Sequence, residues 1–213
     1  MGPYDGGHLQ RLFRGVRLPE RARVVDLGCS TGALLAWLAA RGPIDGLGVD
    51  LRPPRRRIPG VRFHAGDAAE VIGGGCDLAC SVGAVSEPWE LAGLARWGGL
   101  VLYGNGYWRR PPSRRYLKAL GAEPDDMTGW RQMRGQGDSM GLELVAAVRS
   151  SCADWDRYED AWAANGERYA ADHAGEPGVD EFLDWIRNGR RRYRELGGRD
   201  TLGFGLLLWR VAP

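Results

Sequence analysis

Three aspartates, Asp26, Asp50 and Asp67, each stand at or just after the end of a short apolar run of the chain. Such runs are typical of buried parallel β-strands. Because the carboxyl ends of parallel strands meet at one edge of a sheet, we expect the three carboxylates to line one crevice. Carboxylates accept hydrogen bonds from sugar hydroxyls and amines, and they attract cations. The spacing therefore predicts a site for a positively charged ligand that also carries hydroxyl groups.

The turn after Asp26 has the pattern G-x-x-x-G from Gly28 to Gly32. Glycines relieve crowding where a ligand lies against bare backbone. Ser30 and Thr31 are natural N-cap residues, so we expect the next helix to begin there with free N–H groups facing the crevice. A dinucleotide fingerprint is G-x-G-x-x-G, and a phosphate loop is G-x-x-x-x-G-K-[ST]. The turn matches neither pattern and has no lysine, so it favours a cationic ligand over a pyrophosphate.

This stretch resembles the first motif of class I S-adenosylmethionine (SAM) dependent methyltransferases, D-x-G-C-G-x-G, with Ser30 in place of the middle glycine. Asp50 stands about 20 residues further on, where an acid takes ribose hydroxyls. The resemblance implies that Asp67 accepts from the adenine amine, that SAM is the cofactor and that S-adenosyl-L-homocysteine is the product. The cofactor-binding residues expected on this basis are Asp26, Gly28, Cys29, Ser30, Thr31, Gly32, Asp50, Leu51, Gly66, Asp67, Ala68, Ser81 and Gly83.

Methyl transfer from a sulfonium needs the nucleophile, the carbon and the sulfur held in line in a dry pocket. A base matters only when the acceptor loses a proton. The candidates are His8, because the N-terminal segment of similar enzymes folds over the cofactor, Glu87, in the loop after the fourth strand, and Tyr107. The three histidines are scattered without ligand spacing, so we expect a reaction without a metal.

The 213 residues fit one α/β domain, and 44% of them are hydrophobic, which is enough for a full core. The net charge of +2 is below the strongly basic balance of a dedicated nucleic-acid domain. Four cysteines without a C-x-x-C pair favour a reduced compartment. No apolar run approaches 18 residues and no leader opens the chain. These features predict a soluble, cytoplasmic protein.

The expected architecture is an α/β fold, a Rossmann-like seven-stranded methyltransferase sheet, mostly parallel with the last strand antiparallel. A short helix around Leu9–Val16 belongs to a cofactor-covering segment, residues 1–20, and three prolines forbid a helix in 51–60. The expected strands are 24–27, 47–50, 61–68, 76–84, 99–104, 142–148 and 202–211, with helices at 33–41 and 89–97.

A helical cap, residues 152–199, is inserted between the last two expected strands, which are separated by far more chain than a hairpin requires. Its first helix carries an aromatic stripe, Trp155, Tyr158, Trp162 and Tyr169. The stripe favours packing of one helix on the other, and the alternative is an aromatic wall for a substrate. The arginines of 190–194 suit the C-terminal end of the second helix.

The later part of the chain, beginning with Tyr107-Trp108, resembles a group of bacterial small-molecule-type methyltransferases, although Asn105-Gly106 stands where members carry a glutamate. The predicted function is metal-independent methyl transfer to O, N or C of a small molecule, without nucleic-acid or membrane partners. Neither an Asn/Asp-Pro-Pro-Tyr nor a Pro-Cys motif of base-methylating enzymes follows the fourth expected strand. One alternative is an RNA or protein methyltransferase using the arginines of 52–57 and 109–115, and another is a SAM-binding protein that transfers no methyl. The oligomeric state is left open, a homodimer included.

Overall fold

The structure, a computed structural model, describes residues 2–71 and 73–212. The chain divides into two compact units. The first, called the sheet unit, contains Met1–Asn105, Arg131–Arg149 and Gly205–Pro213. The second, called the helical unit, contains Gly106–Trp130 and Ser150–Phe204. Within the described ranges, no helix is both long and apolar enough to cross a bilayer.

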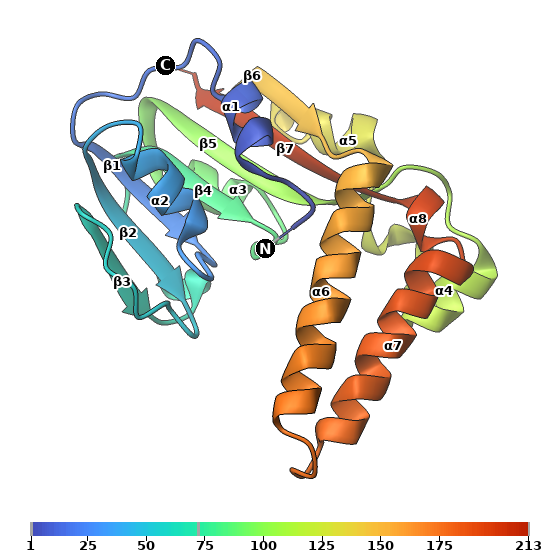
Figure 1. Ribbon diagram of the computed structural model, residues 1–213. Helices are drawn as coiled ribbons and strands as arrows, with labels where there is room; N and C mark the ends of the chain where they lie inside the picture. Colours follow the sequence, from blue (N-terminus) through green and yellow to red (C-terminus); the bar gives the residue numbers. More distant parts are fainter. Residues whose placement is uncertain (1, 72, 213) are drawn as a thin grey trace. The chain divides into compact units, whose positions relative to one another are not determined.

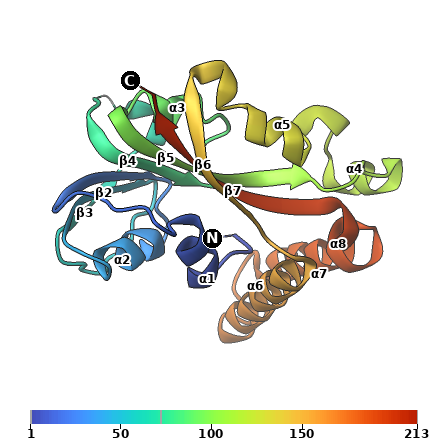
Figure 2. The same ribbon diagram turned by 90° about the horizontal axis from the view of Figure 1, so that it is seen from above.

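The centre of the sheet unit is a seven-stranded sheet with the strand order β3-β2-β1-β4-β5-β7-β6 (Figure 1). The pairs β1–β2, β1–β4, β2–β3 and β4–β5 are parallel, whereas β6–β7 is antiparallel. Figure 2 shows β7 running opposite to β5. The strands are β1 (Ala22–Leu27), β2 (Ile44–Asp50), β3 (Val61–Ala65), β4 (Cys76–Val82), β5 (Ala95–Trp108), β6 (Leu142–Arg149) and β7 (Leu202–Val211). The predicted Rossmann-like sheet with an antiparallel last strand is confirmed.

Short helices cover both faces of this sheet, with α1 and α2 on one face and α3 and α5 on the other (Figure 2). Asp5 caps α1, and that helix turns its apolar residues Leu9 and Leu12 into the core. On β7, Trp209 is fully buried and its ring lies 6.1 Å from that of Tyr103. The helices and 3₁₀ turns of this layer are α1 (Gly6–Leu12), α2 (Ala33–Ala39), η1 (Ala68–Glu70), α3 (Trp89–Ala92), α5 (Trp130–Gly135) and η3 (Asp138–Met140).

The helical unit is organised around two long antiparallel helices, α6 (Cys152–Asp172) and α7 (Val179–Glu195), which Figure 1 shows side by side. Gly166 allows their close approach, because a Cβ there would lie 2.5 Å from Cδ1 of Ile186. The aromatic stripe of α6 meets rings of α7, with Trp162 and Trp185 4.9 Å apart. The stripe therefore contributes to helix–helix packing, as the first of the two interpretations predicts. Shorter elements are α4 (Arg114–Leu120), η2 (Pro124–Asp126) and α8 (Gly198–Thr201).

Most expected elements differ from the structure by a few residues at one or both ends, and the helix expected over 89–97 differs most in kind. The helix expected over 89–97 ends at Ala92, and Trp97 belongs to β5. The chain leaves the helix at Gly93 because β5 begins early and pairs Ala95 with Cys76, before an irregularity in the register that includes Gly98 at φ 71°. In contrast, residues 51–60, all of them described, contain no helix, as their prolines predict.

Candidate functional site

The turn between β1 and α2 depends on bare glycine backbone. Gly28 has φ 71°, and a Cβ there would lie 2.0 Å from Cβ of Ala84. Gly32 has φ 70°, and its Cβ would lie 2.7 Å from the Phe63 ring. The N–H groups of residues 28 and 29 both donate to the carbonyl of Val49 on β2, at 2.8 and 3.0 Å. The turn is therefore fastened to the neighbouring strand and leaves no room for side chains at its two corners.

Asp50, at the end of β2, is held in place by main-chain donors. Its Oδ2 accepts from the N–H of Ser30 at 2.9 Å, and its Oδ1 accepts from the N–H of Arg52 at 2.9 Å. Ser30 adopts a left-handed backbone with φ 49°. These two bonds fix the carboxylate beside the glycine turn, and an ionised carboxylate retains acceptor capacity beyond two bonds.

The prediction that Ser30 and Thr31 cap the following helix is wrong. Helix α2 begins at Ala33, its N-cap residue is Gly32, and no side chain makes a capping hydrogen bond. The reason is that the turn places Gly32 in the left-handed region and directs the N–H of Ser30 to Asp50.

The strand register brings the three predicted carboxylates to one edge of the sheet. Leu27 pairs with Val49 on β2, so Asp26 and Asp50 stand on adjacent strands near their carboxyl ends. Asp50 pairs with Ala65 of β3, and Asp67 follows two residues later. Asp67 is exposed, and its carbonyl accepts from Glu70 in the turn that begins at Ala68.

The environment of Asp26 disfavours its ionised form. Only 3% of the residue is exposed, and burial, followed by the charge of Asp50, raises its pKa to about 7. Burial also raises the pKa of Tyr4 to about 12, with a smaller contribution from Asp26 and then Cys80. The N-terminal segment thus lies close to the buried carboxyl. A cation entering this place would stabilise the charged form of Asp26.

Two predicted cofactor residues at the end of β4 differ in what they can contact. Ser81 is buried, its hydroxyl donates to the carbonyl of Leu27 at 2.9 Å, and it accepts from the N–H of Val85 at 3.2 Å. Ser81 therefore joins β4 to β1 and positions the following loop. Gly83 is exposed, and a Cβ there would meet nothing within 4 Å.

The three candidate bases have different surroundings. His8 is buried in the sheet unit, and Asp5 orients its ring, with Nδ1 2.7 Å from Oδ1. Glu87, in the same unit, is exposed and accepts from Nε2 of Gln136 at 3.4 Å. Tyr107 belongs to the helical unit, where it is buried with its ring 5.2 Å from that of Trp130.

Sequence reasoning missed the side chains that hold the loop after β4. The hydroxyl of Tyr103 donates to the carbonyl of Ser86 at 2.7 Å, and Nδ2 of Asn105 donates to the Tyr103 hydroxyl at 2.8 Å. The position of Asn105 just after a predicted strand was a usable signal, because polar residues at strand ends face the ligand edge of such sheets. For Gln136, the partner of Glu87, the sequence offers no signal.

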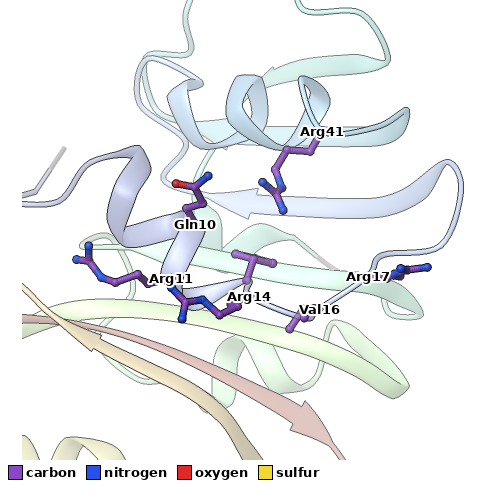
Figure 3. A pocket seen from close by; sticks show the side chains of 8 residues that line it. Gln10, Arg11, Arg14, Val16, Arg17 and Arg41 are labelled. Carbon is purple, nitrogen blue, oxygen red and sulfur yellow. The ribbon is translucent and has the colours of Figure 1, made fainter.

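A wide hollow elsewhere in the sheet unit has a different lining. Its volume is about 690 Å³, and Figure 3 shows arginines of α1, of the segment after α1 and of the segment after α2 around it. Arg17 precedes β1 and Arg41 precedes β2, so the hollow lies toward the amino ends of the strands. None of the predicted cofactor residues line it. The sheet edge that carries Asp26, Asp50 and Asp67 is therefore a separate place.

Comparison with known proteins agrees with this geometry, although no protein-family model matches the chain. A SAM-dependent methyltransferase from Thiobacillus denitrificans, solved in complex with S-adenosyl-L-homocysteine, matches with a TM-score of 0.83 at 25% identity, covering 98% of this chain and 92% of that one. The uncharacterized Escherichia coli protein YjhP is 29% identical over 183 residues, which are 75% of this chain and 73% of YjhP. Trans-aconitate 2-methyltransferase from Methylobacterium nodulans is 44% identical over 66 residues, 28% of this chain and 26% of that protein.

The likeness to the Thiobacillus enzyme extends over nearly the whole chain. The strand order, the antiparallel β7 and the glycine turn after β1 are the features that the sequence resemblance implies. The chain has the fold of the class I SAM-dependent methyltransferases, and it is similar over nearly its whole length to one solved with S-adenosyl-L-homocysteine.

Proposed function

We propose that the chain transfers the methyl group of SAM to a small-molecule acceptor and binds the cofactor along the carboxyl edge of β1, β2 and β3. The observation that carries this proposal is the fixed carboxylate of Asp50 beside the bare turn Gly28–Gly32. Two main-chain bonds hold that carboxylate without exhausting its lone pairs, so it is set to accept from a pair of ribose hydroxyls.

The neighbouring residues fit the remaining parts of the cofactor. Leu51 is 74% exposed directly after Asp50, which gives the adenine an apolar surface on which to lie. Asp67 and the turn at Gly66–Ala68 are assigned to the adenine amine. Gly83 offers open backbone on the β4 side. Asp26 is assigned to the amino-acid end of SAM, because the ammonium there would stabilise the ionised form that burial of this carboxyl disfavours.

When bound, SAM supplies an activated methyl group on a sulfonium. The protein then has to bind, orient and exclude water. Tyr4 and α1 are assigned to the cover over Asp26, in keeping with the charge effect of Asp26 on Tyr4. If the acceptor has to lose a proton, His8, with its ring oriented by Asp5, is our first choice of base in the sheet unit, ahead of Glu87, and Tyr107 is the choice in the helical unit.

A small-molecule acceptor is supported by the modest net charge of +2 and by the long helical segment between β6 and β7. The likeness to trans-aconitate 2-methyltransferase spans only 66 residues, so it does not carry that substrate to this chain. We assign the helical segment to acceptor specificity and expect a soluble, cytoplasmic enzyme.

The cofactor assignment is tested by titrating SAM into the purified full chain and its Asp50→Ala variant by calorimetry. Loss of hydrogen bonds to a charged group should weaken binding by about 1.5–3 kcal/mol. Asp45→Ala is the matched control, because Asp45 lies on the same strand and is exposed, and its carboxylate forms an ion pair with Arg62 on β3, at 3.4 Å. Unchanged affinity in Asp50→Ala would show that the ribose assignment is wrong.

The acceptor class is tested separately by measuring S-adenosyl-L-homocysteine formation. Pools of carboxylates, amines and phenols are compared with purified RNA and with a protein extract from which small molecules have been removed. Product from a small-molecule pool alone supports the proposal. Product from the RNA or the protein fraction alone would contradict it.

A further inference from the structure

A second hollow lies within the helical unit, between α6, α7 and α4, and has a volume of about 360 Å³. This is within the range of small-molecule pockets, about 300–1,000 Å³. Five of its ten lining residues are aromatic, and two charged side chains, Glu159 of α6 and Arg192 of α7, also line it. The hollow therefore combines an apolar surface with one group of each charge.

The aromatic wall is built on a glycine. Trp162 and Trp185 lie edge to face at 4.9 Å and 69°. A Cβ at Gly189 would lie 3.0 Å from Cζ3 of Trp162, so the absence of a side chain lets that indole rest on α7. Trp185 is 53% exposed in spite of its size. A ligand with an apolar body would cover this ring and gain the hydrophobic free energy of doing so.

Three polar groups of the hollow, those of Glu159, Arg192 and Trp155, lack hydrogen-bond partners among the described residues. Glu159 is half-buried, and no described group forms a hydrogen bond or ion pair with its carboxylate. Arg192 is also half-buried and equally without a partner in the described part of the chain. The indole Nε1 of Trp155, which lines the same hollow, is buried and has no acceptor there. Polar groups left this way in a partly buried place cost free energy that a ligand would recover.

The two charges are near each other but not joined. Burial raises the pKa of Glu159, while Arg192, more weakly than Arg194, counteracts that rise. Burial raises the pKa of the Tyr116 hydroxyl to about 12. The charge of Glu159 adds to this rise, and the charge of Arg192 opposes it. An acid and a base that face one hollow without pairing can be bridged by a molecule that carries both opposite charges.

We propose that this hollow binds a small zwitterion whose ammonium meets Glu159, whose carboxylate meets Arg192 and whose apolar or aromatic body lies on Trp162 and Trp185. The aromatic faces add attraction for the ammonium. The chemical class is that of an amino acid with an aromatic side chain. The assignment goes beyond the proposed function and does not depend on SAM binding.

The test is calorimetric titration of the full chain, without SAM, with three probes that share one ring. L-phenylalanine carries both charges, phenethylamine lacks the carboxylate and 3-phenylpropanoate lacks the ammonium. We expect one saturable site for L-phenylalanine and affinities about tenfold or more lower for the other two probes. Absence of saturable L-phenylalanine binding, or equal affinity for all three probes, would overturn the proposal.

Two charge-neutral variants locate the site. Glu159→Gln should weaken the binding of phenylalanine and phenethylamine but leave the binding of 3-phenylpropanoate unchanged. Arg192→Gln should weaken the binding of phenylalanine and 3-phenylpropanoate but leave the binding of phenethylamine unchanged. The matched controls are Glu167→Gln and Arg191→Gln, exposed positions on the same two helices that do not line the hollow. Thermal melting of each variant establishes that it is folded. Binding that survives both variants, or that the controls weaken equally, would refute the site.

Discussion

If Asp26 meets the ammonium of SAM, as we propose, its raised pKa makes cofactor binding a proton-release reaction. In the unliganded chain this pKa is about 7, because the carboxyl is buried and close to Asp50. The amino-acid end of SAM carries an ammonium, which remains charged below about pH 7.7–8.0. If the cofactor binds only the ionised form of Asp26, its apparent affinity scales with the ionised fraction. Affinity should therefore increase as the pH rises toward and past 7.

The size of the effect follows from the pKa of about 7. The ionised fraction is about 3% at pH 5.5 and about 75% at pH 7.5, which predicts an increase in affinity of about 25-fold. The variant Asp26→Asn keeps the shape of the side chain and removes its titration. It should bind about tenfold or more weakly at pH 7.5 and show a nearly flat pH profile.

Calorimetry in paired buffers of different ionisation enthalpy measures both quantities. At pH 6 the native chain should release about 0.9 proton for each SAM bound, and Asp26→Asn should release close to none. Asp45→Asn, an exposed acid on β2, is the control and should behave like the native chain. The reasoning would be refuted by a SAM affinity that stays constant from pH 5.5 to 7.5, or by the same pH dependence of affinity in Asp26→Asn as in the native chain.

Three further perturbations test the architecture. Gly28→Ala places a methyl 2.0 Å from Cβ of Ala84 at a left-handed φ and should cost about 2–4 kcal/mol in denaturant unfolding; a cost below about 1 kcal/mol would contradict the close approach. Gly166→Ala should push against Ile186 and lower the melting temperature in spite of alanine's higher helix propensity, whereas an increase would contradict that contact. Deleting residues 152–199 and joining the flanking strands by a short turn should leave SAM affinity unchanged and abolish turnover, and surviving turnover would exclude the specificity role.

The apolar strands could be predicted from the sequence because each is specified locally. The strand from Leu202 to Val211 has its predicted bounds, because a continuous apolar run of this length is typical of a buried β-strand. The stretch 89–97 is different, because its mixture of tryptophan, leucine and alanine suits a helix as well as a strand. The pairing of Ala95 with Cys76 places the end of this stretch in a strand, and the two residues are far apart in the sequence.

The site was predictable where it follows from strand ends and not where it follows from long-range contacts. Asp26, Asp50 and Asp67 share an edge because strand order places them there. The left-handed conformation of Ser30 could not be predicted, because serine rarely adopts it. The bond between Gln136 and Glu87 joins residues 49 positions apart through polar side chains, which leave no pattern in the sequence.

The bond from the amide of Ser30 to Asp50 has a consequence for how this turn can change during evolution. The Asp50 carboxylate accepts from the main chain of residue 30, so the side chain at residue 30 can change while this hydrogen bond is preserved. A glycine there, as in the family motif, would relieve a left-handed serine by about 1 kcal/mol. Serine at this position is thus a tolerated departure from the motif.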